Sequence, residues 1–224
     1  MHLSKTRIGL LTIGQSPRDD ITSDVRLLLS SDIEIVEYGI LDDLNPEEIA
    51  FLMPRAQETP LVSRLRDGRQ VLLNEKRIRE LLPEAIEFMN TKMNVNSVGV
   101  LCTHDFPKKK YSCPVIFPSD YMKFIIDEIL GVKKLGVVVP LDSQIEAAKR
   151  KWGRKRLLVV SKSPYVQGKT WNGIADVLFE ERVDTAILDC IGYKIQDRQK
   201  IYNLLNIPIL LPRAILSVAI NQIF

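Results

Sequence analysis

The sequence predicts an α/β fold with two pseudo-symmetric lobes, each a short, mostly parallel sheet covered by helices, and a ligand cleft between the lobes. Short apolar, β-branched runs alternate with helical patterns, which is typical of parallel sheets with helices on both faces. The same series of segments also occurs twice. We expect the first lobe at residues 1–118 and the second at 119–212. The sequence leaves open whether the helix at 213–224 packs back on the first lobe.

Three pairs of segments carry the repeat. They comprise a strand, polar turn and helix (7–21 and 134–148), a strand ending in cysteine (96–106 and 184–194), and a proline-flanked apolar run with an apolar helix (114–129 and 208–223). Because all three recur in the same order, they indicate an internal duplication.

The two halves differ in length between the first and second of these segments. From Ile13 to Cys102 is 89 positions, whereas from Val139 to Cys190 is 51, so the first half carries 38 additional residues. In that insertion Asp67-Gly68 indicates a hairpin turn between strands at 60–65 and 70–73. Asn74 is predicted to cap a helix that follows at about 75–93.

The other elements of the first half follow from local signals. Ser16 is predicted to cap the first helix, because Pro17 then takes the first helical position and Asp19 puts a negative charge in the first turn. Asn45-Pro46 begins a short helix by the same logic. The apolar runs predict strands at 7–13, 33–40 and 97–101.

The second half repeats this alternation. Ser119 is predicted to cap a helix that ends at Gly131. Strands are expected at 135–139, 157–160, 185–188 and 207–211, and helices at 142–152, 170–181 and 194–205, before the final apolar helix.

Composition and charge exclude several classes of protein. The net charge is +3, with 31 basic and 28 acidic residues spread along the chain, so no basic patch for nucleic acid or membrane is predicted. Three cysteines without a Cys-x-x-Cys motif do not form a disulfide framework, and two histidines make the common zinc sites improbable. No targeting or membrane-spanning stretch is evident, so we expect a cytoplasmic protein.

Two cysteines are the strongest candidates for chemistry. Cys102 and Cys190 each end a matching apolar strand, and the carboxyl ends of parallel strands are where α/β proteins build their sites. Two thiols in opposite protonation states can remove and return a proton on opposite faces of a carbon. A buried apolar role is the alternative for each of them.

Further candidates lie in the turns near these strands. Arg18 and Arg213, each beside a proline, could hold a substrate carboxylate in bidentate fashion. Ser16 and Asp142 are candidates both for helix caps and for ligand contacts. The remaining substrate-binding candidates are Thr103, His104, Pro140, Gly192 and Tyr193.

Several strings resemble one family over nearly the whole chain. TIGQSPRDD, LCTHDFP, LGVVVPLDSQ, LDCIGY and PILLPRAIL resemble the AroM family. More remotely, the layout is similar to the aspartate/glutamate racemase superfamily, which includes hydantoin racemases and maleate isomerases. That resemblance implies two α/β lobes, one cysteine after a strand in each, and no metal or organic cofactor.

The chain departs from the superfamily at both cysteines. Cys102 is followed directly by Thr103 with no Asn between them, and Cys190 by Ile191 where the amino-acid racemases have Thr. The substrate therefore stays open, beyond being a small carboxylate.

Three functions are compatible with the sequence. The favoured one is a cofactor-independent racemase or isomerase that uses Cys102 and Cys190. A second is a protein that binds a small metabolite without chemistry. A third uses Cys102 alone as a nucleophile with His104. The apolar final helix is compatible with a homodimer.

Overall fold

The computed structural model describes residues 6–224, which divide into two compact units. The first unit contains residues up to Phe117 together with Leu216–Phe224, and the second contains Pro118–Ile215. Each unit is built on one four-stranded parallel sheet.

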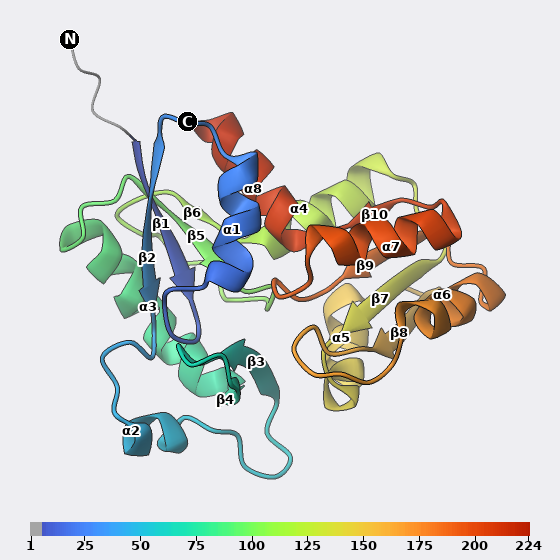
Figure 1. Cartoon of the computed structure of the whole chain (residues 1–224), viewed down its shortest axis with the longest axis horizontal. Coiled ribbons are helices and arrows are strands. Elements are labelled where there is room, and N and C mark those ends of the chain that lie inside the picture. The colour runs from blue at the N-terminus through green and yellow to red at the C-terminus, as the bar shows by residue number, and fades with distance from the viewer. Residues whose placement is uncertain (1–5) are drawn as a thin grey trace. The chain divides into compact units, whose positions relative to one another are not determined.

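The sheet of the first unit has the strand order β2-β1-β5-β6 (Figure 1). Its strands are β1 (Thr6–Thr12), β2 (Ile33–Gly39), β5 (Ser97–Leu101) and β6 (Val115–Ile116). The short, apolar and β-branched β5 is buried throughout, as expected for a central parallel strand.

The sheet of the second unit has the strand order β8-β7-β9-β10. In each unit the first strand along the chain therefore lies between the second and the third, and the fourth lies at the edge beside the third. Its strands are β7 (Leu135–Val139), β8 (Leu157–Ser161), β9 (Thr185–Leu188) and β10 (Ile209–Leu210). The predicted α/β fold with helix-covered parallel sheets is confirmed.

The register of the two sheets is also the same. Ile8 pairs with Ser97 in the first sheet, and the matching Leu135 pairs with Thr185 in the second. The two edge strands agree as well, because the backbone N–H of Val98 donates to Pro114 O (3.0 Å) and that of Ala186 donates to Pro208 O (2.9 Å). The two matching prolines therefore stand at equivalent points of the two sheets.

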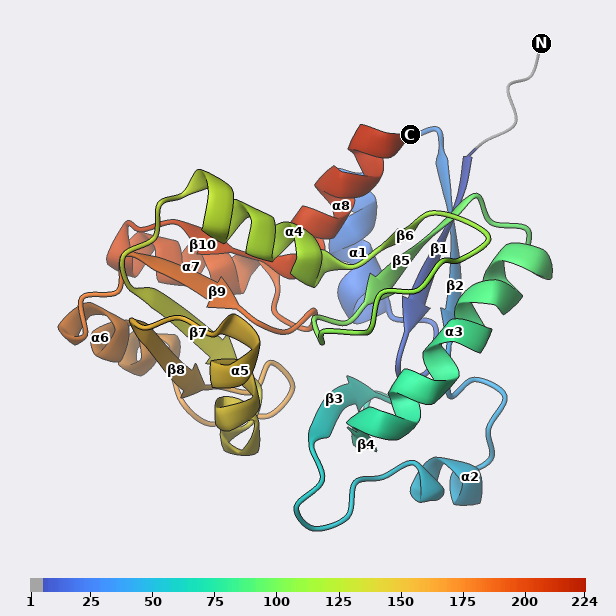
Figure 2. The same ribbon diagram turned by 180° about the vertical axis from the view of Figure 1, so that it is seen from behind.

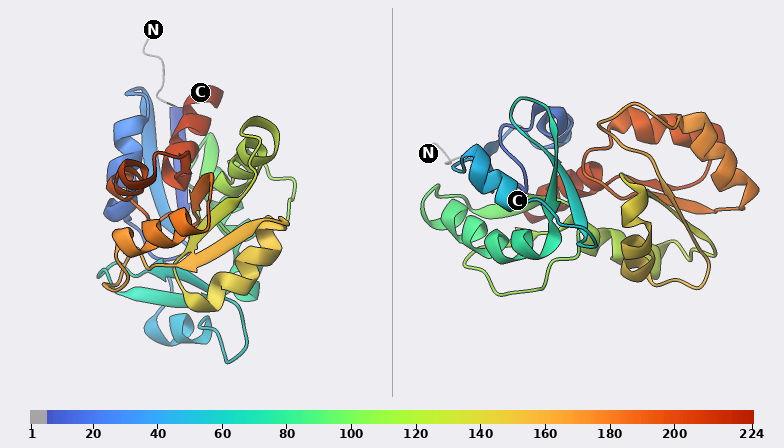
Figure 3. Two further views of the ribbon diagram at one scale, coloured as in Figure 1. Left: turned by 90° about the vertical axis from the view of Figure 1, so that its right-hand side faces the viewer. Right: turned by 90° about the horizontal axis from the view of Figure 1, so that it is seen from below.

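The first unit carries the predicted extra material. It consists of α2 (Pro46–Phe51), the antiparallel hairpin β3 (Pro60–Arg64) and β4 (Gln70–Asn74), and α3 (Glu75–Thr91). Asn45 forms a capping box with Glu48 at α2, and the Asn74 side chain accepts from the Arg77 N–H at α3, so both predicted caps are confirmed. Figure 2 shows α3 running along the sheet, and Figure 3 shows the hairpin beside it.

Helices cover both faces of the second sheet. One face packs against α6 (Trp171–Glu180) and α7 (Ile195–Leu205), and the other packs against α4 (Pro118–Phe124) and α5 (Ile145–Trp152). A π-helical turn at Ile125–Ile129 continues α4.

Two helices each follow a strand of one unit but pack on the sheet of the other unit. Helix α4 follows β6 of the first unit, yet its Met122 belongs to the core of the second. Helix α8 (Pro212–Ile223) follows β10 of the second unit, yet Leu216 and Ile220 lie against Gly99 of β5. Asn221 ties α8 to the end of α1 (Asp19–Leu28) by donating to Leu28 O (2.7 Å).

Three predicted helix starts are wrong. The residue that precedes α1 is Arg18, with no side-chain cap, because the Ser16 side chain is bound to Asp42 instead. Ser119 lies inside α4, since Pro118 takes the first helical position. Asp142 opens a short 3-10 helix, Asp142–Gln144, and α5 begins only at Ile145.

Among the described residues, none of the helices combines the length and the apolar character needed to cross a membrane.

Candidate active site

The two candidate cysteines occupy the same place in their respective sheets. Cys102 directly follows β5, and Cys190 follows β9 with Asp189 between them; the exposed fractions of the two cysteines are 9% and 7%. The backbone N–H of His104 lies 3.5 Å from Cys102 Sγ, and that of Gly192 lies 3.4 Å from Cys190 Sγ. Each sulfur thus accepts from the residue two positions further on, an arrangement that favours a thiolate.

The residues after Cys102 are held by the start of α3. Thr103 is buried, and the His104 imidazole lies 3.1 Å from Glu75, measured from Nε2 to Oε1. The same imidazole packs edge-on against Phe106, with ring centroids 5.1 Å apart. These contacts fix the orientation of the His104 ring.

A buried charged cluster precedes Cys190. Lys151 Nζ lies 2.7 and 3.0 Å from the two carboxylate oxygens of Asp189, and Trp152 Nε1 donates to one of them (2.8 Å). The side chains of Lys151 and Asp189 are only 11% and 5% exposed. Leu101 takes the place of Asp189 before Cys102, so the first unit has no carboxylate at this position.

This cluster was not among the site residues predicted from the sequence. The adjacent Lys151 and Trp152 were a visible signal, since a basic and an aromatic residue end α5 together. Their shared partner lies 37 and 38 positions away, and no local pattern links them.

Tyr193 is an internal support of the turn after Cys190. It is fully buried, its hydroxyl donates to Lys162 O (2.5 Å), and its ring packs against Trp171. Burial, followed by the nearby charges of Cys190 and Asp189, raises the pKa of Tyr193 well above its usual value. A phenol with this environment stays protonated and serves as a donor.

Arg213 also supports that turn. It is fully buried, and its Nε and Nη2 both donate to Ile191 O, at 3.1 and 2.8 Å. The guanidinium is thus directed at the backbone immediately after Cys190. We therefore describe Arg213 as a residue that positions this turn.

Arg18 is bound to a carboxylate of its own chain. Its Nε and Nη2 donate to the two oxygens of Asp20 (2.9 and 3.0 Å), and its Nη1 contacts Thr12 and Ser63. Burial acts to raise the pKa of Asp20, but the hydrogen bonds and charge of Arg18 outweigh it and lower that pKa below its usual value. The sequence-predicted bidentate geometry is present, with Asp20 in place of a substrate.

Ser16 and its neighbours join the loop after β1 to the hairpin. The Ser16 hydroxyl and N–H both bind Asp42, while Arg66 of the hairpin turn donates to Ser16 O (2.7 Å). A Cβ on Gly14 would lie 2.3 Å from Arg64 O, so only glycine allows this approach. The string TIGQSPRDD therefore has a structural explanation in the docking of the hairpin.

The loop after β7 carries the remaining candidates. Pro140 is buried, whereas Asp142 is exposed and accepts from Ser161 and from Lys169. The hydrogen bond from Ser161, followed by that from Lys169, lowers the pKa of Asp142. Asp142 is thus an ionised, paired surface group.

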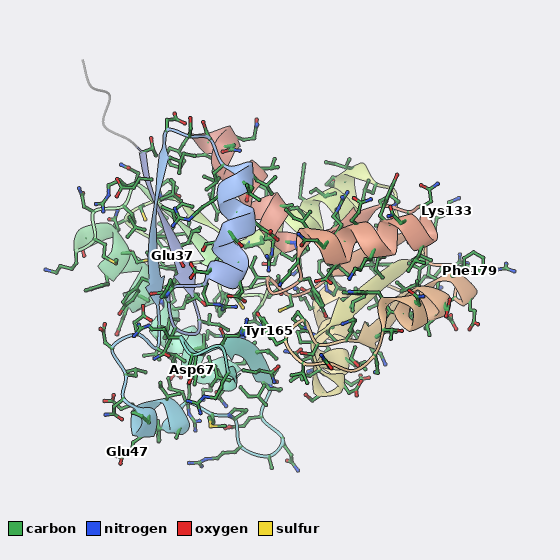
Figure 4. The ribbon with its side chains drawn as sticks, viewed as in Figure 1. Glu37, Glu47, Asp67, Lys133, Tyr165 and Phe179 are labelled. Carbon is green, nitrogen blue, oxygen red and sulfur yellow. The ribbon has the colours of Figure 1, made fainter. Side chains whose placement is uncertain are left out.

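Tyr165 is a second residue that the sequence analysis did not identify. It lies in the loop between β8 and α6 and is labelled in Figure 4. A Cβ on Gly192 would lie 2.3 Å from its hydroxyl and 2.5 Å from its Cζ, so the phenol packs directly on the turn after Cys190. Its sequence neighbourhood offers only a loop signal.

Each unit gathers part of the predicted site. In the first unit Cys102, Thr103 and His104 form one turn, and Ser16 and Arg18 follow the neighbouring strand. In the second unit the contacts described above bring together Cys190, Gly192, Tyr193 and Arg213, while Pro140 and Asp142 follow the adjacent strand β7. Residues 6–224 contain no group of three or more His, Cys, Asp or Glu suited to holding a metal ion.

Solved structures with a similar fold catalyse racemisation, isomerisation and decarboxylation, according to their names. Aspartate racemase from Picrophilus torridus has a TM-score of 0.59 and 14% identity, covering 97% of this chain and 93% of its own. Arylmalonate decarboxylase has a TM-score of 0.57 and 13% identity, with 96% and 92% covered. Maleate isomerase from Pseudomonas putida S16 has a TM-score of 0.55 and 10% identity, with 97% and 92% covered.

The chain accordingly has the two-lobed α/β fold of these racemase-like proteins. Its family is more specific: the model of the AroM protein family matches residues 8–224, and the chain belongs to that family. No curated protein matches the chain.

Proposed function

We propose that the protein is a cofactor-independent enzyme of the racemase or isomerase kind, which acts on a small carboxylate with Cys102 and Cys190 as its acid–base pair. The observation that carries this proposal is the equivalence of the two thiols. Both follow the same strand of the same sheet arrangement, and both sulfurs accept a backbone N–H two residues on.

The chemistry needs one thiolate and one thiol. The thiolate takes the proton next to the carboxylate, so that the C–H bond breaks, an S–H bond forms and the electron pair moves into the enolate. The other thiol then gives its proton to the opposite face of the carbon. The backbone N–H groups beside Cys102 and Cys190 stabilise whichever sulfur is charged.

The substrate carboxylate and the developing enolate need fixed hydrogen-bond donors. Arg18 is bound to Asp20, and Arg213 donates to Ile191 O, so in this proposal both arginines position loops. We assign to the carboxylate and to the developing enolate hydrogen-bond donors from the turns after β5 and β9, the Thr103 hydroxyl among them.

We also propose that the two units arose by duplication of one α/β unit. Their common strand order and common register support this. The duplication would explain why an acid and a base of the same residue type stand at equivalent positions.

Exchange of carbon-bound hydrogen in deuterated buffer tests the function. A panel of amino acids, 2-hydroxy acids and dicarboxylates is incubated with the native protein and with the Cys102→Ser and Cys190→Ser variants. We expect exchange of at least one substrate, with loss of racemisation or isomerisation in both variants by about 10²-fold or more. Unchanged turnover in both variants would refute the two-thiol mechanism.

Cys113→Ser is the matched control. Cys113 lies in the loop before β6, where burial and the charge of Glu87 raise its pKa, and it follows no strand that repeats in the second unit. Its replacement should leave exchange unchanged.

The two alternatives give different outcomes in the same assay. A binding protein would be stabilised by one of the acids in the native form and in both variants, without any exchange. Use of Cys102 as a lone nucleophile with His104 would give a covalent adduct on Cys102, and Cys190→Ser would remain active. The homodimer and the cytoplasmic location stay predictions.

A further inference from the structure

The turn after Cys190 is shaped around a phenol ring. A Cβ on Gly192 would lie 2.3 Å from the hydroxyl oxygen, 2.5 Å from Cζ and 2.9 Å from Cε1 of Tyr165. Separations below 3 Å are far inside the van der Waals contact distance of carbon atoms. A side chain at position 192 would therefore displace the Tyr165 ring or the turn.

Space for Tyr165, and not backbone conformation, explains the glycine. The described glycines with positive φ are Gly68, Gly131 and Gly153, so Gly192 does not use the left-handed region. Gly192 also donates its N–H to Cys190 Sγ (3.4 Å). The phenol thus packs on the same residue that donates to the candidate catalytic sulfur.

Tyr165 is held in this position by its own loop. Ser163 Oγ accepts from the N–H groups of Tyr165 and Val166, both at 3.1 Å. Before that turn, Lys162 O accepts the Tyr193 hydroxyl, and Lys162 Nζ lies 4.8 Å from the centre of the Trp171 ring. The start of the loop is therefore anchored on both sides of its backbone.

The far side of the loop has fewer restraints. Val166 is 55% exposed, and a Cβ on Gly168 would meet no atom within 4 Å. The loop is tied down again at Lys169, whose Nζ donates to Ser161 Oγ (2.7 Å). Tyr165 is consequently the last partly buried residue before the exposed part of the loop, as expected of a side chain that borders a site.

The first unit differs at the matching position. His104 stands in the position of Gly192, two residues after Cys102, and its imidazole is bound by Glu75. The ring at this position is Phe106, which packs edge-on against the His104 imidazole and not on a glycine backbone. The two cysteines therefore differ in which side chain borders them.

We propose that Tyr165 is a specificity-determining residue of the Cys190 half of the site, where its ring limits the size of the group that reaches the thiol. This inference rests on the proposed function and deepens it: the substrate is a carboxylate whose substituent on the Cys190 side is small. Removal of the ring enlarges the space beside Cys190 and leaves Cys102 as it was.

Alkylation of individual cysteines tests this without turnover. The native full-length chain is treated with iodoacetamide and with the bulkier N-phenyl iodoacetamide, and peptide mass spectrometry gives the rate at each cysteine. In Tyr165→Ala we expect the bulky-to-small rate ratio at Cys190 to rise about 10-fold or more. The ratios at Cys102 and Cys113 should not change.

Two further variants complete the design. Tyr165→Phe keeps the ring and should keep the native ratio, while Gly192→Ala should raise the ratio because its Cβ displaces the ring. An unchanged ratio at Cys190 in both Tyr165→Ala and Gly192→Ala, in protein whose thermal unfolding stays cooperative, overturns the inference. A raised ratio together with unaltered exchange in the cysteine variants would refute the two-thiol mechanism and leave Tyr165 as the border of the Cys190 thiol.

Discussion

The two units share a sheet but differ in how they fix the loops around it. The first unit uses its 38 additional residues, through which the hairpin clamps the loop after β1 by contacts of Arg66 with Ser16 and of Ser63 with Arg18. The second lacks that insertion and instead buries a lysine–aspartate pair directly before Cys190. The strand order and register are thus a common frame, and the differences in polar contacts give each cysteine its own surroundings.

The largest loss of unfolding free energy is expected on removing the positive charge of Lys151, which is paired with Asp189. Lys151→Met removes the positive charge paired with the buried Asp189 carboxylate, and breaking a buried ion pair in this way costs about 3–5 kcal/mol of unfolding free energy. Denaturant unfolding measures the loss. Hydrogen exchange should assign it to β7 and β9 and spare β1 and β5.

Lys149→Met is the matched control on the same helix. Lys149 pairs with Glu146 in an exposed contact, which contributes about 1 kcal/mol or less. A loss of equal size in both variants would contradict the importance assigned to the buried pair.

A smaller difference in unfolding free energy is expected between alanine substitutions at the two matching glycines, Gly9 of β1 and Gly136 of β7. A Cβ on Gly136 would lie 2.8 Å from both Leu178 Cδ2 and Val183 Cγ1, whereas one on Gly9 would lie 2.8 Å from the Met89 Cε end. Valine is stiff and methionine adapts, so Gly136→Ala should cost about 1–3 kcal/mol and Gly9→Ala less than about 1 kcal/mol.

Urea unfolding measures the loss of unfolding free energy in the two alanine variants. Equal losses would contradict this prediction, because the side chains packed over the two glycines would then move aside with equal ease. Gly173→Ala, in α6 and with no contact tighter than 3.5 Å, controls for the loss of backbone freedom alone.

The smallest loss of unfolding free energy is expected on removing the N-terminal caps of α3 and α6. Asn74 accepts from the Arg77 N–H and is buried, while Thr170 accepts from the Gly173 N–H at an exposed start. Asn74→Ala and Thr170→Ala should each cost about 1 kcal/mol, and Asn74→Ala should cost more because its donor, the Arg77 N–H, is partly shielded from water that could replace the lost cap. Thermal unfolding of the two variants side by side checks the order.

The sequence allowed the frame to be predicted because its signals are local. Apolar runs, the Asp67-Gly68 turn and the capping residues Asn45 and Asn74 act within a few positions. The alignment of Pro114 with Pro208 could likewise be inferred from sequence spacing, and the two sheets have the same register there.

The sequence could not reveal side-chain competition over long distances. Ser16 has the properties of a helix cap, but Asp42, 26 positions away, takes its hydroxyl. The Lys151–Asp189 pair and the Tyr165–Gly192 contact also depend on segments that only folding brings together. The two cysteines were visible because each ends a strand, whereas the residues that surround them were not.

The crossed positions of α4 and α8 set an order for folding during synthesis. The sheet of the first unit is translated first, yet the helix residues that cover Gly99 and Leu10 emerge only after the whole second unit. The residues of the second unit end at Ile215, whereas the first unit is complete only with Leu216–Phe224. Until Leu216 and Ile220 appear, the sheet of the first unit lacks the side chains that cover Gly99, and a chaperone that recognises exposed apolar surface would have that interval in which to bind.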